Sequence, residues 1–504
     1  MLYQAEPLPD CRRGTEDLLA PLGNGRFPFT IIAFCEERAF QQQVTFGSAD
    51  FYESDHLSLR KTFGFRRRTG GAPEVLLSHI TQGANRDAQV LSFRLRKLYE
   101  SLDTATILLR RLTIMKTAFT ARRLFTPTEE ISDPLLVVED GRIAEISSRS
   151  AKAVAVNEKI VDFGDATLAP GFLDIHIHGG AGIDAMRAPA SDLSRLGKFL
   201  ASHGVTGYFP TTVAAPLDAT CEALERLADA IEAESNQKAN GDSPSARPLG
   251  IHLEGPFLSH KRRGVHPPEY LAIPTVEIFD RLWQAARGHV RMMTIAPEIP
   301  GAMEVIAEAA RRGVCVSIGH SDAEMPIAQQ AVKAGARHAT HTFNAMRPLD
   351  HRDPGIIGEV LSDDTITADL IADGIHVSPP VVKVFLQAKG VERAVLITDA
   401  ISATGMPEGR YKLGPIEVDV KDGKCTANGS LAGSVLTMDR AVRNVTRFSN
   451  WTLRDAVRAA TLNPARAAGL PPTLGILTPG AQADFTVLNS LGEVTKTIVG
   501  GRGI

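Results

Sequence analysis

The 504-residue sequence is poor in several features that mark large classes of protein. Its five cysteines are scattered and include no Cys-x-x-Cys pair, so neither a disulfide framework nor a cysteine-ligated zinc site is indicated, and a reducing cytoplasm is the expected location. No uninterrupted apolar run approaches the roughly 20 residues that span a bilayer. The first residues also lack the basic-then-apolar order of a secretory signal.

An excess of charge of one sign is missing as well. The net charge is -3, which gives no bias toward nucleic acid or an anionic membrane, and we expect neither as a partner. No glycine-rich dinucleotide fingerprint follows a predicted strand, which disfavours a nicotinamide-dependent dehydrogenase, and no P-loop pattern occurs. The 43% hydrophobic and 22% charged residues are ordinary for a soluble globular protein, and the length is enough for more than one domain.

Residues 1–114 differ from the rest of the sequence. They contain arginine clusters such as "FRRRTGG" and lack repeated strand–helix alternation, although "VLSFRLRKLYESLDTATILLRRL" has the pattern of one basic amphipathic helix. We interpret this segment as a poorly ordered N-terminal extension of unknown role. The alternative is a regulatory or partner-binding arm.

The two flanks of the remaining sequence are rich in short strand patterns. Residues 115–169 contain "AFTARRLFT", "PLLVVEDGRIAEISS" and "KIVDFGDATLAP", with "EDGR" as a turn signal. Residues 476–504 contain "DFTVLNSLGEVTKTIVGG", which has the same style. The sequence therefore predicts one small β-sandwich domain built from both flanks.

The middle region, residues 170–475, alternates strand and helix patterns. The predicted strands lie in "GFLDIHIHGG", "GVTGYFPT", "LGIHLEGPF", "VRMMTIAPE", "VCVSIGHS", "HATHTFNAM", "ITADLIADGIH" and "AVLITDA". Helical patterns lie between most of them, for example "LDATCEALERLADAIEAES", "GAMEVIAEAARRG" and "PIAQQAVKAG". This alternation predicts an α/β fold of the (β/α)8 TIM-like barrel type, with an open doubly wound sheet as the alternative.

Polar residues gather where these strands end. His176 and His178 are two positions apart on a predicted buried strand, so both imidazoles point to the same face. In a parallel barrel the C-terminal strand ends meet at one face. The polar residues that the sequence places there are His176, His178, His252, Glu254, His320, His341, Asp373, His376 and Asp399. Three or more histidine and carboxylate ligands with room for water make a catalytic metal site, whereas a lone histidine is more often a hydrogen-bonded core residue.

The motifs carry a resemblance to a known family. The stretches involved are "APGFLDIHIHGG", "HLEGPF", "GVH", "SIGHSDA", "THTFNAM", "ADGIHV", "LITDA", "LAGSVLTM", "NPARAAGL" and "LTPGAQADF". Together they resemble the amidohydrolase superfamily, and within it the N-acetylglucosamine-6-phosphate deacetylases. The resemblance covers residues 115–504, and residues 1–114 have no counterpart in it.

The resemblance implies a metal site. The dependable ligands of these deacetylases match Glu254, His320 and His341, and the retained His176 and His178 allow a second ion. One or two divalent ions are implied, with zinc as the first choice and iron as the alternative. No lysine stands in "TIAPE", so Glu254 is the expected bridge if two ions bind, and the alternative for His176 and His178 is a metal-free, hydrogen-bonded pair.

The resemblance also implies an activity. It implies hydrolysis of N-acetylglucosamine 6-phosphate to glucosamine 6-phosphate and acetate, with Asp399 as the catalytic acid–base residue. His266 would bind substrate and stabilise the tetrahedral oxyanion, and the phosphate would meet Asn344, Ala345, Arg352 and His376, with Arg347 as the alternative arginine. The full set of implied substrate-binding residues is Val265, His266, Asn344, Ala345, Arg352, His376, Leu431, Ala432, Gly433 and Ser434.

Several alternatives stay open at this point. N-acetylgalactosamine 6-phosphate is a rival substrate, because motifs do not reveal which configuration of one hydroxyl is preferred. Another amidohydrolase, such as an N-acyl-amino-acid deacylase or a cyclic amidase, would share the metal site and lack the phosphate grip. A non-catalytic scaffold would need neither the ligands nor Asp399. A homodimer is expected, in which Arg352 reaches its own or the partner's site.

Overall fold

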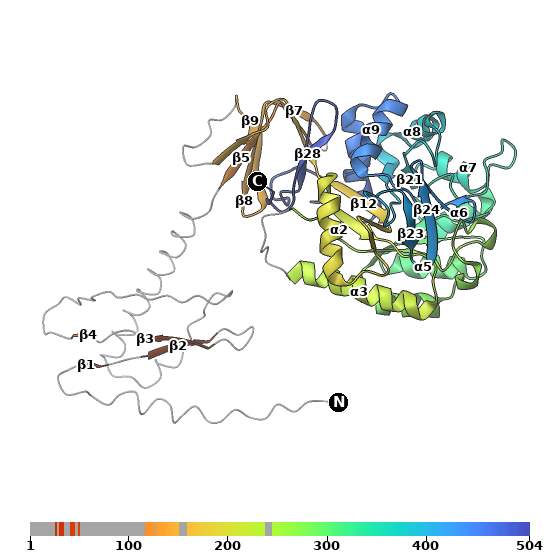
Figure 1. The fold of residues 1–504 in the computed structure, drawn as a ribbon, viewed down its shortest axis with the longest axis horizontal. Coiled ribbons are helices and arrows are strands. Elements are labelled where there is room, and N and C mark those ends of the chain that lie inside the picture. Colours follow the sequence, from red (N-terminus) through yellow and green to blue (C-terminus); the bar gives the residue numbers. More distant parts are fainter. Residues whose placement is uncertain are drawn as a thin grey trace. The chain divides into compact units, whose positions relative to one another are not determined.

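A computed structural model describes residues 116–126, 128–150, 159–236 and 244–503, together with four short strands nearer the N-terminus (Figure 1). The chain divides into two compact units, residues 1–113 and 114–504, and each is described by itself. In the first unit, β1 (Arg26–Phe27) pairs antiparallel with β4 (Ala49–Asp50), and β2 (Thr30–Phe34) pairs antiparallel with β3 (Gln41–Thr45). The basic helix predicted in residues 90–112 lies outside the described residues.

Two sheets form from the flanks of the second unit. A four-stranded sheet has the order β10-β5-β8-β9, and a five-stranded sheet has the order β28-β27-β11-β6-β7. Their bounds are β5 Thr117–Thr120, β6 Arg123–Phe125, β7 Glu130–Ser132, β8 Pro134–Glu139, β9 Arg142–Ser148, β10 Lys159–Asp162, β11 Thr167–Pro170, β27 Phe485–Leu488 and β28 Val494–Ile498. Strands therefore lie in every stretch where the sequence of the flanks predicts them.

Residues from the two flanks share one hydrophobic core. Phe119 and Leu136 belong to the first sheet, Leu168 and Phe485 belong to the second, and all four side chains are fully buried in the same cluster. The turn between β8 and β9 passes through Asp140 and Gly141 with φ values of 50° and 74°, the left-handed conformation that tight hairpins require. The hairpin signal read from "EDGR" is therefore confirmed.

Nine parallel strands lie in the described part of the middle region. They are β12 Phe172–Ile177, β15 Val205–Pro210, β16 Arg247–Pro248, β17 Ile251–Glu254, β18 Val290–Ile295, β19 Cys315–Ile318, β20 His338–Ala339, β21 Thr367–Ile371 and β22 Ala394–Ile397. One sheet runs β12-β15-β16 and the other runs β17-β18-β19-β20-β21-β22, with every pair parallel. The parallel bridge Thr211–His252 joins the end of β15 to β17, and the parallel bridge Ile177–Ala400 joins the end of β12 to the segment after β22.

Helices follow most of these strands and cover the sheets from outside (Figure 1). Their bounds are α2 Ala190–Ser202, α3 Leu217–Asn236, α4 Val276–Ala285, α5 Ala302–Arg311, α6 Met325–Ala334, α7 Gly355–Ser362, α8 Pro379–Arg393, α9 Met438–Phe448, α10 Leu453–Ala459 and α11 Leu462–Ala467. Local sequence explains their starts: the Thr452 hydroxyl and the Asp455 carboxylate form a capping box at α10. The strand–helix alternation read from the sequence is confirmed.

A four-stranded antiparallel sheet lies between β22 and α9. Its strands are β23 Gly409–Leu413, β24 Ile416–Lys421, β25 Lys424–Ala427 and β26 Ser430–Leu431. The sequence analysis did not predict it, although Ile416, Val418 and Val420 alternate with exposed polar residues and Asp422–Gly423 is a hairpin turn signal. Among the described residues, none of the helices is long and apolar enough to cross a membrane.

We expect a protein that starts at Met115 to be soluble, to bind metal and to have a kcat/KM similar to that of the full chain. The described sheets of the second unit all start after that residue, and so do all candidate site residues. The measurement compares metal content and kcat/KM of the two proteins. Aggregation of the shorter protein, or a loss of more than about tenfold in kcat/KM, which is about 1.4 kcal/mol, would show that the second unit needs residues 1–114 for its structure.

Candidate metal-dependent active site

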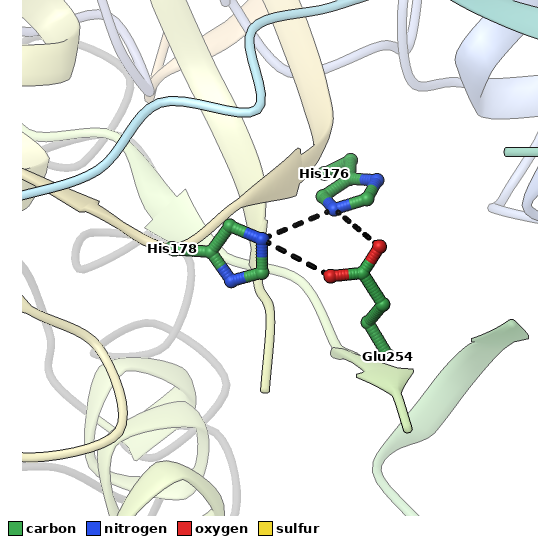
Figure 2. Close-up of side chains that lie close together, drawn as sticks. All are labelled: His176, His178 and Glu254. Carbon is green, nitrogen blue, oxygen red and sulfur yellow. Dashed lines mark hydrogen bonds and ion pairs between the residues drawn. The ribbon is translucent and has the colours of Figure 1, made fainter. Parts of the chain in front are cut away.

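The ends of β12 and β17 bring two histidines and a glutamate together (Figure 2). His176 Nε2 lies 3.3 Å from His178 Nε2 and 3.6 Å from Glu254 Oε1, and His178 Nε2 lies 3.3 Å from Glu254 Oε2. All three side chains are buried. Because β12 is pleated, the rings two residues apart face the same side, as the sequence predicts.

The ends of β19 and β20 supply a second group around the same glutamate. His320 Nε2 lies 3.1 Å and His341 Nε2 lies 3.0 Å from Glu254 Oε1, and the two imidazole nitrogens are 3.0 Å apart. Glu254 therefore belongs to both groups that have the geometry of a metal site. His320 and His341 have φ values of 46° and 30°, so the backbone is held in the left-handed region as each strand ends.

Backbone partners determine the tautomers of two of these histidines. His178 Nδ1 lies 3.2 Å from the Thr211 carbonyl oxygen, and His320 Nδ1 lies 2.9 Å from the Arg262 carbonyl oxygen. A carbonyl only accepts, so Nδ1 carries the hydrogen and Nε2 of the neutral ring presents a lone pair. These lone pairs and the Glu254 carboxylate would repel one another with nothing between them. The donor set fits a divalent cation at this position.

The protonation behaviour of the group leads to the same conclusion. Burial lowers the pKa of His178, but hydrogen bonds to Asp399 and Glu254 outweigh it and raise the pKa to about 10. For His341, burial again lowers the pKa and the contact with Glu254 raises it to about 9. The buried carboxylates thus attract positive charge, which protons supply when no metal is bound.

Asp399 follows β22 and faces the first group. Its Oδ1 lies 3.1 Å from His178 Nε2 and 3.6 Å from His176 Nε2, and the side chain is buried. Burial raises the pKa of this carboxyl. The opposite effect of His176 and His178 is larger, and it lowers the pKa to about 2. Asp399 is therefore ionised at neutral pH and is placed beside the candidate ligands.

The segment 432–434 lies against the backbone of Asp399. Ser434 N–H donates to the Asp399 carbonyl oxygen at 2.7 Å, and Ile401 N–H donates to the Ser434 carbonyl oxygen at 3.0 Å. At Gly433 the φ value is 60°, and a Cβ would lie 2.4 Å from Ile401 Cγ2 and 3.0 Å from the Asp399 carbonyl oxygen. Glycine is required here because another side chain would push aside the strand end that contains Asp399.

His266 differs from the other histidines of the site. Its Nδ1 accepts a hydrogen bond from the Ala214 backbone N–H at 3.1 Å, so the hydrogen of the neutral ring is on Nε2. That Nε2 lies 3.5 Å from Glu254 Oε2. His266 therefore presents a hydrogen-bond donor to the site where His178 and His320 present lone pairs. Val265 beside it is half-buried.

The predicted phosphate-binding residues have fewer contacts with the group around Glu254 than the candidate metal ligands have. Asn344 and Ala345 follow His341 directly, and Asn344 Nδ2 donates to the His341 carbonyl oxygen at 3.3 Å. His376 Nδ1 is paired with Asp373 Oδ2 at 2.7 Å, and Arg352 is exposed. Within the described residues, no contact joins Arg352 or His376 to the candidate metal ligands.

Some polar residues of the strands proved to be structural. His252 is fully buried, with Nδ1 3.2 Å from the Ile175 carbonyl oxygen and Nε2 2.8 Å from Thr294 Oγ1, so it is a satisfied core histidine whose ring packs against His176. The sequence analysis missed Asp174, which is fully buried and accepts the Thr398 hydroxyl at 2.5 Å, joining β12 to β22. The sequence contained a signal for Asp174, because residues two apart on a strand share a face and Asp174 therefore lies on the same face as His176 and His178.

Comparison with known proteins explains this arrangement. Residues 167–504 match the model of the amidohydrolase family. The chain belongs to the amidohydrolase family. An N-acetylglucosamine-6-phosphate deacetylase of Lysinibacillus sphaericus is 39% identical over 72% of this chain and 92% of that protein. An N-acetylgalactosamine-6-phosphate deacetylase of Escherichia coli O157:H7 is 38% identical over 73% of this chain and 94% of that protein.

A solved structure gives the same result for the fold. The structure of a variant N-acetylglucosamine-6-phosphate deacetylase from Mycobacterium smegmatis, in complex with N-acetylglucosamine 6-phosphate, is 35% identical with a TM-score of 0.72, over 77% of this chain and 99% of that chain. The second unit is therefore an amidohydrolase fold. Amidohydrolases are metal-dependent, which agrees with the His and Glu groups described above.

Proposed function

We propose that this amidohydrolase removes the acetyl group of N-acetylglucosamine 6-phosphate and releases acetate and glucosamine 6-phosphate. The observation that carries the proposal is the meeting of Asp399 with the group around Glu254, in a chain whose curated relatives are deacetylases of such sugars. The test is an assay of acetate release from this substrate. Absence of turnover by metal-loaded protein would refute it.

The proposed fold is a closed (β/α)8 barrel. The bridges Thr211–His252 and Ile177–Ala400 join β15 to β17 and β12 to β22, so they link the two parallel sheets on both sides and support a closed ring of strands. The proposed domains are the barrel at residues 170–475 and a β-sandwich at residues 115–169 and 476–504. In this architecture the candidate site lies at the C-terminal strand ends, where barrel enzymes have their active sites.

The proposed metal ligands are Glu254, His320 and His341 for one divalent ion. His176 and His178 would hold a second ion that shares Glu254. Imidazole and carboxylate donors suit zinc first and iron second. The alternative interpretation of His176 and His178 as a metal-free pair requires a proton between the two Nε2 atoms, which lie 3.3 Å apart.

The chemistry divides between the metal and the chain. A bound divalent ion polarises the amide carbonyl and lowers the pKa of water from 15.7 toward ~7. The Asp399 carboxylate takes the proton of the attacking water and then delivers it to the leaving nitrogen. His266 Nε2–H donates to the carbonyl oxygen as negative charge develops on it. The 432–434 segment, with Leu431 before it, keeps Asp399 aligned and lines the sugar position.

The proposed phosphate grip consists of Asn344, the Ala345 backbone, Arg352 and His376. Arg347 is the weaker candidate, because its guanidinium is already paired with Asp353 and contacts the Asp322 carbonyl oxygen at 3.4 Å. Arg352 is exposed, and no ion pair of its side chain occurs among the described residues. Its planar fork is suited to a phosphate.

Arg352→Ala is expected to lower kcat/KM for the phosphorylated sugar by roughly 10–100-fold, because a charge-assisted hydrogen bond contributes about 1.5–3 kcal/mol. The unphosphorylated sugar should be affected much less. Arg410→Ala, which alters an exposed arginine of β23, is the matched control. Equal losses on both sugars would show that Arg352 does not contact the phosphate.

A homodimer and a cytoplasmic location complete the proposal. Leu349, in the same loop as Arg352, is 52% exposed, which suits a contact with a second subunit. Mixing Arg352→Ala with Asp399→Asn protein distinguishes the two places in which Arg352 can act. Activity returns in mixed dimers only if Arg352 reaches the partner's site, since one site then contains an intact residue of each kind.

The configuration of the sugar is the remaining alternative. The relative that acts on the N-acetylgalactosamine compound is as similar to this chain as the others, so that sugar is the second candidate substrate. Comparing kcat/KM for the two 6-phosphates decides between them. An N-acyl-amino-acid deacylase or cyclic amidase would turn over neither of them.

A further inference from the structure

Two sequence fragments that the proposed function does not use meet in the structure. They are the glutamate of "TIAPE", which follows β18, and the "SD" of "SIGHSDA", which follows His320. Glu298 Oε2 accepts a hydrogen bond from Ser321 Oγ at 2.7 Å, and Glu298 Oε1 accepts one from the Asp322 backbone N–H at 2.6 Å. One carboxylate therefore holds the two residues that directly follow a candidate metal ligand.

Ser321 extends this connection to the loop after β20. Its N–H donates to the Ala345 carbonyl oxygen at 3.0 Å, and its carbonyl oxygen accepts from Arg347 N–H at 2.8 Å. Ser321 is fully buried, and Ala345 has a φ value of 50°, a conformation that alanine adopts only when its surroundings enforce it. The backbone proposed to meet the phosphate is thus fixed against Ser321.

Asp322 extends the connection to a third segment. Its Oδ1 accepts from Arg262 Nε at 2.8 Å, and the Arg262 carbonyl oxygen is the partner of His320 Nδ1 at 2.9 Å. The 259–266 loop, which ends at His266, also contacts this turn through Ser259 N–H, which donates to the His320 carbonyl oxygen at 3.0 Å. Three segments of the site therefore converge on residues 320–322.

We propose that Glu298 is a positioning residue, which fixes His320 and the Ala345 backbone relative to each other through Ser321 and Asp322. This inference rests on the proposed function of the site. Without the carboxylate, the buried Ser321 hydroxyl and the Asp322 N–H lose their acceptor, and the turn must shift to find others. A misplacement of about 1 Å in a catalytic group costs on the order of 10²-fold in rate.

The test compares Glu298→Ala and Glu298→Gln with Glu304→Ala, which alters an exposed glutamate of α5. Zinc affinity is measured by competition with a chromogenic chelator, and KM and kcat are measured with the phosphorylated sugar. We expect Glu298→Ala to weaken zinc affinity and to raise KM, each by about 10–100-fold, the usual cost of losing a partner that orients a ligand. Glu304→Ala should match the wild type.

Glu298→Gln should recover most of both losses, because its carbonyl oxygen accepts from Asp322 N–H and its amide donates to Ser321 Oγ. Wild-type zinc affinity and KM in Glu298→Ala, or a Gln variant as defective as the Ala variant, would overturn the proposal. If Glu298→Ala does not fold, Ser321→Ala replaces it, and an unchanged KM there overturns the proposal equally. Zinc affinity is measured without sugar. An inactive wild type would therefore refute the proposed function, and the zinc affinities of the Glu298 variants would still test the positioning role.

Discussion

Asp399→Asn is expected to lower kcat by about 10²–10⁴-fold, the usual contribution of a positioned acid–base group. An amide neither takes the proton of water nor delivers it to the leaving nitrogen. Asparagine keeps the shape of the side chain and tolerates the φ value of 50° at this position, so the fold should be retained. Steady-state kinetics and metal analysis of the purified variant are the measurements.

The control for this experiment is Asp419→Asn, which makes the same change at an exposed position of β24. Its kcat should equal that of the wild type. The Asp399 variant should still bind metal, because the proposed ligands are unchanged. A kcat near the wild-type value in Asp399→Asn would remove this residue from the mechanism.

Glu254→Gln is expected to have the second large effect, because Glu254 is the residue that both candidate ligand groups share. Loss of its charge should remove stoichiometric metal and lower kcat by more than about 100-fold. Losing a residue that only orients a metal ligand costs up to about 100-fold, and losing a ligand itself should cost more. Elemental analysis of protein purified without chelator, combined with kinetics, measures both. An active variant with full metal content would refute the role of Glu254.

The number of ions follows from a companion variant. His178→Gln alters only the group that contains His176 and His178. If two ions bind, this variant should lose one of them and keep the other at Glu254, His320 and His341. Wild-type protein without stoichiometric metal would refute both the one-ion and the two-ion forms of the proposal.

The sequence predicted much of the fold because its signals are local. Most predicted strands of the middle region are apolar runs that end in a polar motif, and β12, β17 and β22 lie where those runs predict them. The antiparallel sheet at residues 409–431 was missed because clear alternation of apolar and polar residues is confined to β24. The residues on either side of β24 are mostly polar and hide this short pattern. Alternation of apolar and polar residues over one short segment predicts a strand only weakly unless a second segment nearby can pair with it.

The candidate site was predictable as a set of residues and not as a hydrogen-bond pattern. Strand-end positions bring Glu254, His320 and His341 together because parallel strands end at the same face. The backbone carbonyls that determine the tautomers, those of Thr211 and Arg262, belong to other strands and loops. No spacing in the sequence reports such contacts, and the same is true of Glu298 and Ser321.

The pairing of β11 with β27 has a consequence for the order in which the protein folds. Thr167 faces Leu488 across this ladder, so the edge of β11 finds its partner only after more than three hundred residues have been synthesised. Until then that edge is open to other strands, which is a hazard for aggregation. Closing so long a loop is slow, and we expect prior folding of the parallel sheets between β11 and β27 to bring the two strands together. We therefore expect the five-stranded sheet of the flanks to be the last part of the unit to be completed on the ribosome, after the parallel sheets between β11 and β27.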